Sequence, residues 1–400
     1  MSYPAIDFDQ MIAPLTRERF LAEYWTKKFL HLAGPKGRFT PILPWEELSH
    51  ILEWHPPPQP QLRMFQENVM IDLRRYIDGS VGSLRLNAGG LIALLGQGAT
   101  MILDALHEVS PAVAHLTQSL ETTLSCACSA NLYAGWRTQK GFNVHWDAHE
   151  VFVLQLSGRK RWQVFAPTRT DPLGDDSETA PPPTAPPIWE GILNDGDFLY
   201  IPRGFWHVAT PLDEPSLHVN CSAQPATAME FLTWWMRTLR RHPEARISLT
   251  QLEDPGTRKQ FVARMTKLIE ASGAGDPLGK FLGSQKAARR NRPRIRLPMA
   301  PNEQRKPLTS PSIRIRLALQ GSLHVEKEPG EPMAKFFASG TYWFIRPEFI
   351  PAFQRLSGHE SVPFQDLAAM LPDRQLIGML ATAIDTMANA GLIFKEEASN

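Results

Sequence analysis

The sequence of 400 residues has little cysteine, little net charge and no long apolar run, and each shortage excludes a class of protein. The three cysteines, Cys126, Cys128 and Cys221, are too few for a disulfide framework, and Cys126 and Cys128 lack the two-residue gap of a redox or zinc pair. A formal net charge of +1 gives no overall attraction to nucleic acid or membranes. No apolar run reaches the roughly 18 residues of a transmembrane helix, and the start does not resemble a signal peptide. We therefore expect a soluble protein of the cytoplasm that has no membrane partner.

The chain is long enough for more than one hydrophobic core. At about 150 residues per domain, its length predicts two or three domains. One dense basic stretch occurs, between Lys280 and Lys306, and it also contains several prolines. We favour a charged interdomain linker for this stretch; the alternative is a contact for ribosomal RNA or an acidic protein.

The segment from Gly141 to Phe165 carries the most informative residues. His145 and Asp147 lie two positions apart, so that on an extended chain both side chains leave the same face. A third ligand is predicted at His207, because the apolar run Phe198–Ile201 ends there in a Pro-Arg-Gly turn. Two imidazoles and a carboxylate that leave coordination sites open are the ligand set of non-haem Fe(II) oxygenases. Each residue alone is more often structural, whereas the combination predicts an iron site.

A hairpin follows the metal pair, with predicted strands at Val151–Leu156 and Arg161–Phe165. Lys160 stands at its turn, and strand alternation points Arg159 and Arg161 to the opposite side. Without further information, such a basic turn would be a solvated hairpin end. On an extended chain His149 would point to the same face as His145. It lies about 13 Å further along, however, so we expect it at the edge of the pocket or on the surface.

Other stretches predict elements around this segment. Thr16 is a plausible N-cap for a helix that ends near Lys27, and a short strand follows at Phe29–Leu32. Ile102–Leu120 has helical periodicity, with Ser110-Pro111 as a start or a break. Residues 121–134 alternate like a buried strand, and from Ala226 apolar residues recur at helical spacing.

The blocks GFNVHWDAHEVFVLQLSGRKRWQVFAP and NDGDFLYIPRGFWHVA resemble the JmjC-type, cupin-like ribosomal protein hydroxylases, and most of all the bacterial members that act on arginine. The blocks FLAEYWTKKFLHL and SLHVNCSA are similar to the same family. The resemblance covers roughly the first 225 residues by motif and the rest by the order of elements. It implies an α+β fold with a double-stranded β-helix, the jelly-roll or cupin-like barrel, in residues 1–225. It further implies a helical dimerisation region and basic linker in 226–300, a winged-helix-like domain in 301–400, and a homodimer.

The resemblance also assigns roles to individual residues. It implies that Fe(II) is bound by the catalytic residues His145, Asp147 and His207, and that 2-oxoglutarate is the co-substrate. It places the far carboxylate of 2-oxoglutarate on Lys160. Further pocket residues implied by the resemblance are Asn131 and Ser222 near 2-oxoglutarate and Tyr133 near the substrate. Asn220 departs from the family pattern, because small hydroxyl residues are common at its position.

The function implied is hydroxylation of an arginine, or else a histidine, in a large-subunit ribosomal protein. Two alternatives stay open. The first alternative is a JmjC oxygenase that acts on another protein or a small molecule. The second is a non-catalytic cupin-like scaffold that binds the ribosome or protein partners. Direct nucleic-acid binding is not inferred, because the predicted helix Ile377–Ala390 carries no lysine or arginine.

Overall fold

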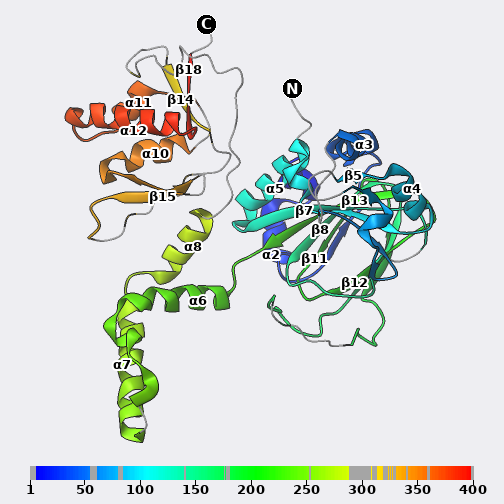
Figure 1. Cartoon of the computed structure of the whole chain (residues 1–400), viewed down its shortest axis with the longest axis horizontal. Coiled ribbons are helices and arrows are strands. Elements are labelled where there is room, and N and C mark those ends of the chain that lie inside the picture. Colours follow the sequence, from blue (N-terminus) through cyan, green and yellow to red (C-terminus); the bar gives the residue numbers. More distant parts are fainter. Residues whose placement is uncertain are drawn as a thin grey trace. The chain divides into compact units, whose positions relative to one another are not determined.

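The computed structural model describes residues 6–54, 61–79, 84–138, 141–174, 176, 181–251, 254–287, 308, 313–318, 323, 325, 327, 330–338, 341–357 and 361–397. The chain divides into two compact units, Met1–Pro225 and Ala226–Asn400 (Figure 1). The predicted division into residues 1–225, 226–300 and 301–400 stays a prediction, since its second boundary lies outside the described residues. Among the described helices, none combines the length and apolar composition that crossing a membrane requires.

Two sheets form the first unit. The larger sheet has eight strands in the order β1 (Leu30–Leu32), β11 (Phe198–Ile201), β8 (Glu150–Ser157), β13 (Ser216–Gln224), β7 (Ala127–Gly135), β6 (Thr100–Leu103), β2 (Leu62–Gln66) and β3 (Val69–Met70). The smaller has three strands in the order β10 (Trp189–Leu193), β9 (Lys160–Phe165) and β12 (Trp206–Pro211). All described pairings in both sheets are antiparallel. A pair of short strands, β4 (Ile77–Asp78) and β5 (Arg85–Leu86), stands apart from them.

Strand alternation on β8 separates two cores. Phe152 and Leu154 belong to the main core, which the N-terminal helices cover. Val151 and Val153 point the other way and pack with Trp162 of β9 in a smaller core between the two sheets. The two sheets therefore face each other through side chains, and the predicted α+β cupin-like fold is confirmed. Closure into a barrel stays a prediction, because the described strands form two separate hydrogen-bonded sheets.

Helices cover the outer face of the larger sheet. They are α1 (Phe8–Ile12), α2 (Arg17–Glu23), α3 (Trp45–Trp54), α4 (Ala88–Gly96) and α5 (Pro111–Leu124), with 3-10 turns at Thr40–Ile42, Leu73–Arg75 and Leu106–Glu108. Thr16 caps α2 as predicted, since its side chain accepts a hydrogen bond from the backbone N–H of Arg19 at 3.3 Å. The predicted helix at Ile102–Leu120 is wrong in its first part, where Ile102 and Leu103 lie in β6, and correct from Pro111 on.

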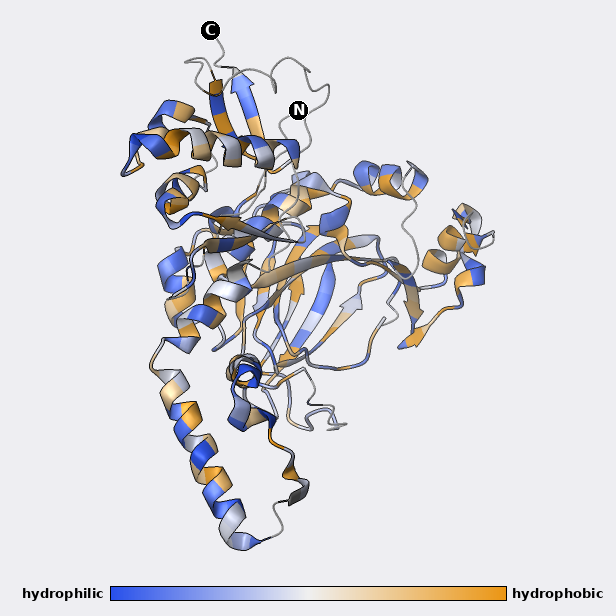
Figure 2. Ribbon diagram, turned by 60° about the vertical axis from the view of Figure 1, so that its left-hand side comes forward, coloured by the Kyte–Doolittle hydropathy of each residue, from blue (hydrophilic) through white to orange (hydrophobic). Residues whose placement is uncertain are grey.

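The second unit begins with helices α6 (Ala228–Thr238), α7 (Pro255–Gly273) and α8 (Pro277–Ala287), between which lie 3-10 turns at Leu239–Arg241, Pro243–Arg246 and Leu249–Gln251. Apolar residues of α7 alternate with hydrophilic ones along the helix (Figure 2). The predicted basic linker lies outside the described residues from position 288 on.

A small mixed region follows in the same unit. Its strands are β14 (Ile313–Leu317), β15 (Ala334–Ala338), β16 (Thr341–Ile345), β17 (Val362–Pro363) and β18 (Ile393–Glu397). Its helices are α10 (Ile350–Leu356), α11 (Phe364–Ala368) and α12 (Ile377–Asn389), with 3-10 turns at Pro347–Phe349 and Arg374–Leu376. These elements share one hydrophobic core. The winged-helix-like assignment itself stays a prediction.

A buried carboxyl group lies under the helical layer. Glu150 is fully buried at the start of β8, and the hydroxyl of Tyr200 donates a hydrogen bond to it. The same hydroxyl accepts a hydrogen bond from the backbone N–H of Thr26 at 2.8 Å, which ties the end of the helical layer to β11. Burial raises the pKa of Glu150 to about 7.

We expect this carboxyl group to make stability fall with rising pH. Because the pKa of Glu150 is about 7 in the folded state and 4.5 ordinarily, the folded state holds the extra proton between these values, and this contribution is lost as the pH rises through 7. In urea denaturation, the free energy of unfolding of the wild type relative to Glu150→Gln should fall by on the order of 3 kcal/mol between about pH 4.5 and 7. A difference that does not change over this range would contradict the assignment.

Candidate metal centre

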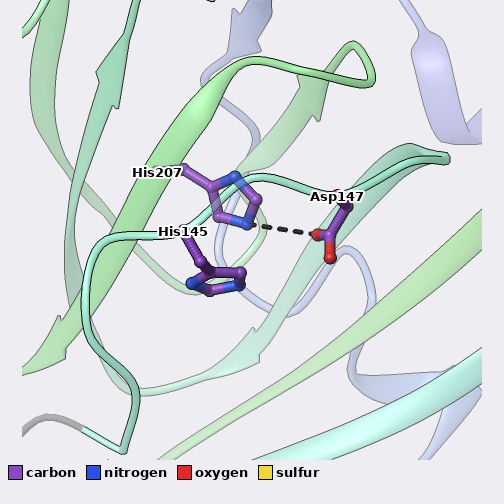
Figure 3. Close-up of side chains that lie close together, drawn as sticks. All are labelled: His145, Asp147 and His207. Atoms are coloured by element: carbon purple, nitrogen blue, oxygen red, sulfur yellow. Dashed lines mark ion pairs between the residues drawn. The ribbon is translucent and has the colours of Figure 1, made fainter. Parts of the chain in front are cut away.

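Two imidazoles and one carboxylate converge where the segment before β8 pairs with β12. The ligand atoms of His145, Asp147 and His207 all lie within 4.8 Å of one another (Figure 3). The two histidine rings are 4.5 Å apart between centroids, and His207 Nε2 lies 3.4 Å from Asp147 Oδ2. The structure thus brings together the three residues that the sequence predicted as ligands.

Backbone hydrogen bonds hold this convergence. His145 and His207 form an isolated antiparallel bridge, with N–H to C=O distances of 3.1 and 2.7 Å in the two directions. The backbone N–H of Gly204, in the turn before β12, donates to the carbonyl of Asp147 at 2.9 Å. The segment that carries two ligands is therefore paired directly with the strand that carries the third.

In each histidine a hydrogen bond occupies Nδ1 and leaves Nε2 as the ligand atom. His145 Nδ1 lies 2.9 Å from the carbonyl oxygen of Asn143, and His207 Nδ1 lies 3.1 Å from that of Phe205. Since a carbonyl only accepts, both Nδ1 atoms carry a proton, and Nε2 of each ring is the nitrogen that can bind a metal. A backbone carbonyl behind each metal-binding histidine is the usual outer support of such sites. The residues present therefore fit a divalent metal.

The protonation states fit as well. Burial, and then the neighbouring His207, lower the pKa of His145, so this imidazole is neutral at physiological pH. Burial opposes the charge on Asp147, but the neighbouring imidazole of His207, 3.4 Å away, holds the pKa of the Asp147 carboxyl below its usual range. His149 Nε2 lies 4.0 Å from Asp147 Oδ2 and is outside the ligand cluster, as expected.

Lys160 lies between the sheets. Its side chain is buried, whereas Arg159 and Arg161 point outward and pair with Glu214 and Glu190. Burial lowers the pKa of Lys160 to about 7. Among the described residues no carboxylate pairs with this cation, and its hydrogen-bond partner is His218 Nδ1 at 3.2 Å.

The other predicted pocket residues lie on β7 and β13. Tyr133 stacks on the ring of His218 at 5.0 Å, and burial, followed by the charge of Asp147, raises the pKa of Tyr133 to about 12. Asn131 has a structural partner, since its Oδ1 accepts a hydrogen bond from the backbone N–H of Ala105 at 3.0 Å. Ser222 is buried two positions beyond Asn220 on β13.

The sequence did not single out His218 and Trp162 as site residues. Trp162 stacks on His207 with ring centroids 6.2 Å apart and meets His218 edge-on at 5.6 Å. Strand alternation could have identified both residues. Trp162 lies two positions after Lys160 and so shares its face of the strand, and His218 lies on the polar face of its own strand. Asn220, on the same face, has a buried Oδ1 without a hydrogen-bond partner among the described residues.

The assignment of the ligands can be tested by metal binding. His207→Ala should weaken Co(II) or Mn(II) binding by at least about 100-fold, since it removes a ligand rather than an outer support. His149→Ala is the matched control, because it removes a neighbouring imidazole outside the cluster, and its affinity should stay close to that of the wild type. Titration calorimetry measures both; an equal loss in the two variants would contradict the assignment.

Comparisons with known proteins agree with this geometry. A family model described as the JmjC domain matches residues 105–231. The chain is 29% identical over 220 residues to the bifunctional lysine-specific demethylase and histidyl-hydroxylase NO66 of Drosophila pseudoobscura pseudoobscura, which covers 54% of this chain and 22% of that protein. It is 29% identical over 226 residues to ribosomal oxygenase 1 of Rattus norvegicus, covering 54% and 36%. The match thus spans well under half the length of these curated relatives.

Solved structures extend the likeness in fold to nearly the whole chain. A crystal structure of the Escherichia coli ribosomal oxygenase YcfD aligns with a TM-score of 0.57 at 17% identity, covering 96% of this chain and 98% of that one. A structure of YcfD in complex with cobalt and 2-oxoglutarate aligns with a TM-score of 0.56 at 17% identity, covering 96% and 99%. The ligand cluster lies inside residues 105–231, which match the JmjC domain, and the chain is thus similar to ribosomal oxygenases that carry this domain.

Proposed function

We propose that this protein is an Fe(II)- and 2-oxoglutarate-dependent oxygenase that hydroxylates an arginine side chain of a large-subunit ribosomal protein. The observation that carries the proposal is the pairing of an open ligand cluster with a buried cation that has no carboxylate partner among the described residues. Three protein ligands leave sites of an octahedral ion free for a co-substrate and dioxygen. A buried ammonium in turn selects for an anion, because an uncompensated charge between the sheets is costly.

Bound iron would supply the activation of dioxygen, with the keto acid as reductant. The protein supplies position and environment. The bridge between His145 and His207 fixes two ligands, and Lys160 would bind the far carboxylate of 2-oxoglutarate. Val153 and Val164 are buried in the small core between the sheets, and the low dielectric of this interior would strengthen the attraction between Lys160 and a bound carboxylate. Asn131 and Ser222 are proposed to border the same co-substrate.

Aromatic residues support the choice of a flat, cationic substrate side chain. Tyr133 meets Phe142 edge-on at 6.4 Å, and Phe142 lies 4.9 Å from Phe65 and 6.0 Å from the metal ligand His145. A guanidinium group stacks well on such rings. Histidine is the second candidate, since the curated relatives include proteins named histidyl-hydroxylase.

The proposal includes a homodimer formed through the helices that begin the second unit. On α6, Met229, Leu232 and Met236 are 53%, 42% and 42% exposed. On α8, Leu278 and Leu282 are 49% and 46% exposed. Apolar side chains gathered on exposed helices mark an association surface in many proteins.

Turnover tests the function directly. Purified protein with Fe(II), 2-oxoglutarate and isolated large-subunit ribosomal proteins should release succinate and add one oxygen atom to one ribosomal protein. Intact-mass analysis identifies that protein, and fragment masses locate the arginine or histidine. His145→Ala should abolish both products, and His149→Ala should keep them. A non-catalytic scaffold would give no succinate and unchanged masses with the wild type.

Co-substrate kinetics test the role of Lys160. Lys160→Met should raise the KM for 2-oxoglutarate by roughly 30-fold or more, since a lost buried charge pair costs at least about 2 kcal/mol. Because the pKa of Lys160 is about 7, its cation is lost at higher pH and the wild-type KM should rise above pH 7. Lys160→Arg should flatten that rise, since guanidinium stays charged. Arg161→Met, which alters the exposed neighbour, should change neither value; a similar loss in both Met variants would contradict the assignment.

A further inference from the structure

We propose that His218 is a positioning residue for the co-substrate site: its Nδ1 accepts a hydrogen bond from the Lys160 ammonium and fixes where the far carboxylate of a keto acid is bound. This inference rests on the proposed function and deepens it. His218 lies on β13 of the larger sheet and Lys160 on β9 of the smaller sheet, so their contact of 3.2 Å bridges the sandwich. Both side chains are buried, with exposures of 2% and 3%.

While Lys160 is charged, its hydrogen bond to His218 has one consistent polarity. Lysine ammonium only donates, so His218 Nδ1 is the acceptor and its proton is on Nε2. Burial, and then the charge of Lys160, lower the pKa of His218, which keeps the ring neutral. His218 therefore orients Lys160 without cancelling its charge, and two ammonium N–H groups remain for a carboxylate.

The groups that face this pair are uncharged. Tyr133 on β7 keeps its proton, since burial raises its pKa to about 12. On β8, Gln155 is paired in register with His218 and donates its amide to backbone carbonyls, among them that of Ser157 at 2.9 Å. On β10 and β12, the register partners of Lys160 are Leu193 and Pro211. Among the described residues nothing here supplies a counter-charge, which leaves that role to a bound anion.

Two aromatic contacts hold the His218 ring. Tyr133 is stacked on it, with an interplanar angle of 6°, and Trp162 meets it edge-on at 78°. Trp162 also stacks on the metal ligand His207. Contacts therefore run from Lys160 through His218 and Trp162 to the metal centre. Such a connected set would hold the anchor at one separation from the metal, and a site adapted to 2-oxoglutarate, as proposed above, would then discriminate against its six-carbon homologue.

Two variants separate hydrogen bonding from packing. His218→Phe keeps an aromatic ring against Tyr133 but removes the acceptor. His218→Asn removes the ring but places an amide oxygen near the position of Nδ1. If the acceptor matters, His218→Phe should raise the KM for 2-oxoglutarate about tenfold with kcat nearly unchanged, because a hydrogen bond to a charged group is worth about 1.5–3 kcal/mol. His218→Asn should stay within a few-fold of the wild type. The preference for 2-oxoglutarate over 2-oxoadipate should fall in His218→Phe alone.

The reverse order, with His218→Asn impaired and His218→Phe normal, would mean that the ring only packs and would overturn the inference, as would wild-type values in both. Co(II) titration of each variant checks that the metal centre is intact. A wild type that neither binds nor turns over 2-oxoglutarate would overturn the proposed function instead.

A measurement on the wild type does not depend on how the variants fold. Nitrogen-15 NMR of histidine-labelled protein, recorded below pH 7 where Lys160 is charged, should report an unprotonated Nδ1 and a protonated Nε2 for His218 in the absence of the keto acid. Either variant assigns the signal by its loss. A proton on Nδ1 would overturn the inference, because that nitrogen could not then accept a hydrogen bond from Lys160.

Discussion

The short backbone bridge between His145 and His207 is the interaction on which the site depends. It joins a segment that is not part of a longer strand to the edge of the three-stranded sheet. Two backbone hydrogen bonds thus hold this segment in place, whereas other segments of the fold are held by longer strand pairing. The hydrogen bond from Gly204 to Asp147 is a third. Each histidine then needs one carbonyl behind it to present Nε2, and both carbonyls lie two residues upstream in the same segments.

The space between the sheets is divided between apolar packing and buried polar groups. Val151, Val153 and Val164 pack there, and their side chains have no polar group that needs a hydrogen-bond partner. Close by, Lys160 and His218 are equally buried, although burial penalises the charge on Lys160. The buried amine loses its charge above about pH 7 unless an anion stabilises it, and the low dielectric that lowers its pKa also makes that attraction strong. Anion binding and stability of the interior are therefore coupled.

Several elements were predictable because their signals are local. Alternation along the hairpin correctly put Lys160 and its basic neighbours on opposite sides, and Thr16 was a correct helix cap. The helix expected from Ile102 failed because a fully buried strand and a buried helix have the same continuous apolar pattern. Ile102 pairs with Arg63 and Tyr133 from elsewhere in the chain, which no local window contains.

The sequence alone determined which residues can bind a metal, since His145, Asp147 and His207 are recognisable by type, spacing and flanking residues. It also determined the period of each strand, and hence which side chains share a face. Only the tertiary structure decided which faces meet. Lys160 and His218 belong to different sheets, and their contact, like the stacking of Trp162 on His207, exists because the two sheets pack face to face. Periodicity fixes the direction of a side chain within its strand, whereas its partner is set by the packing of distant segments.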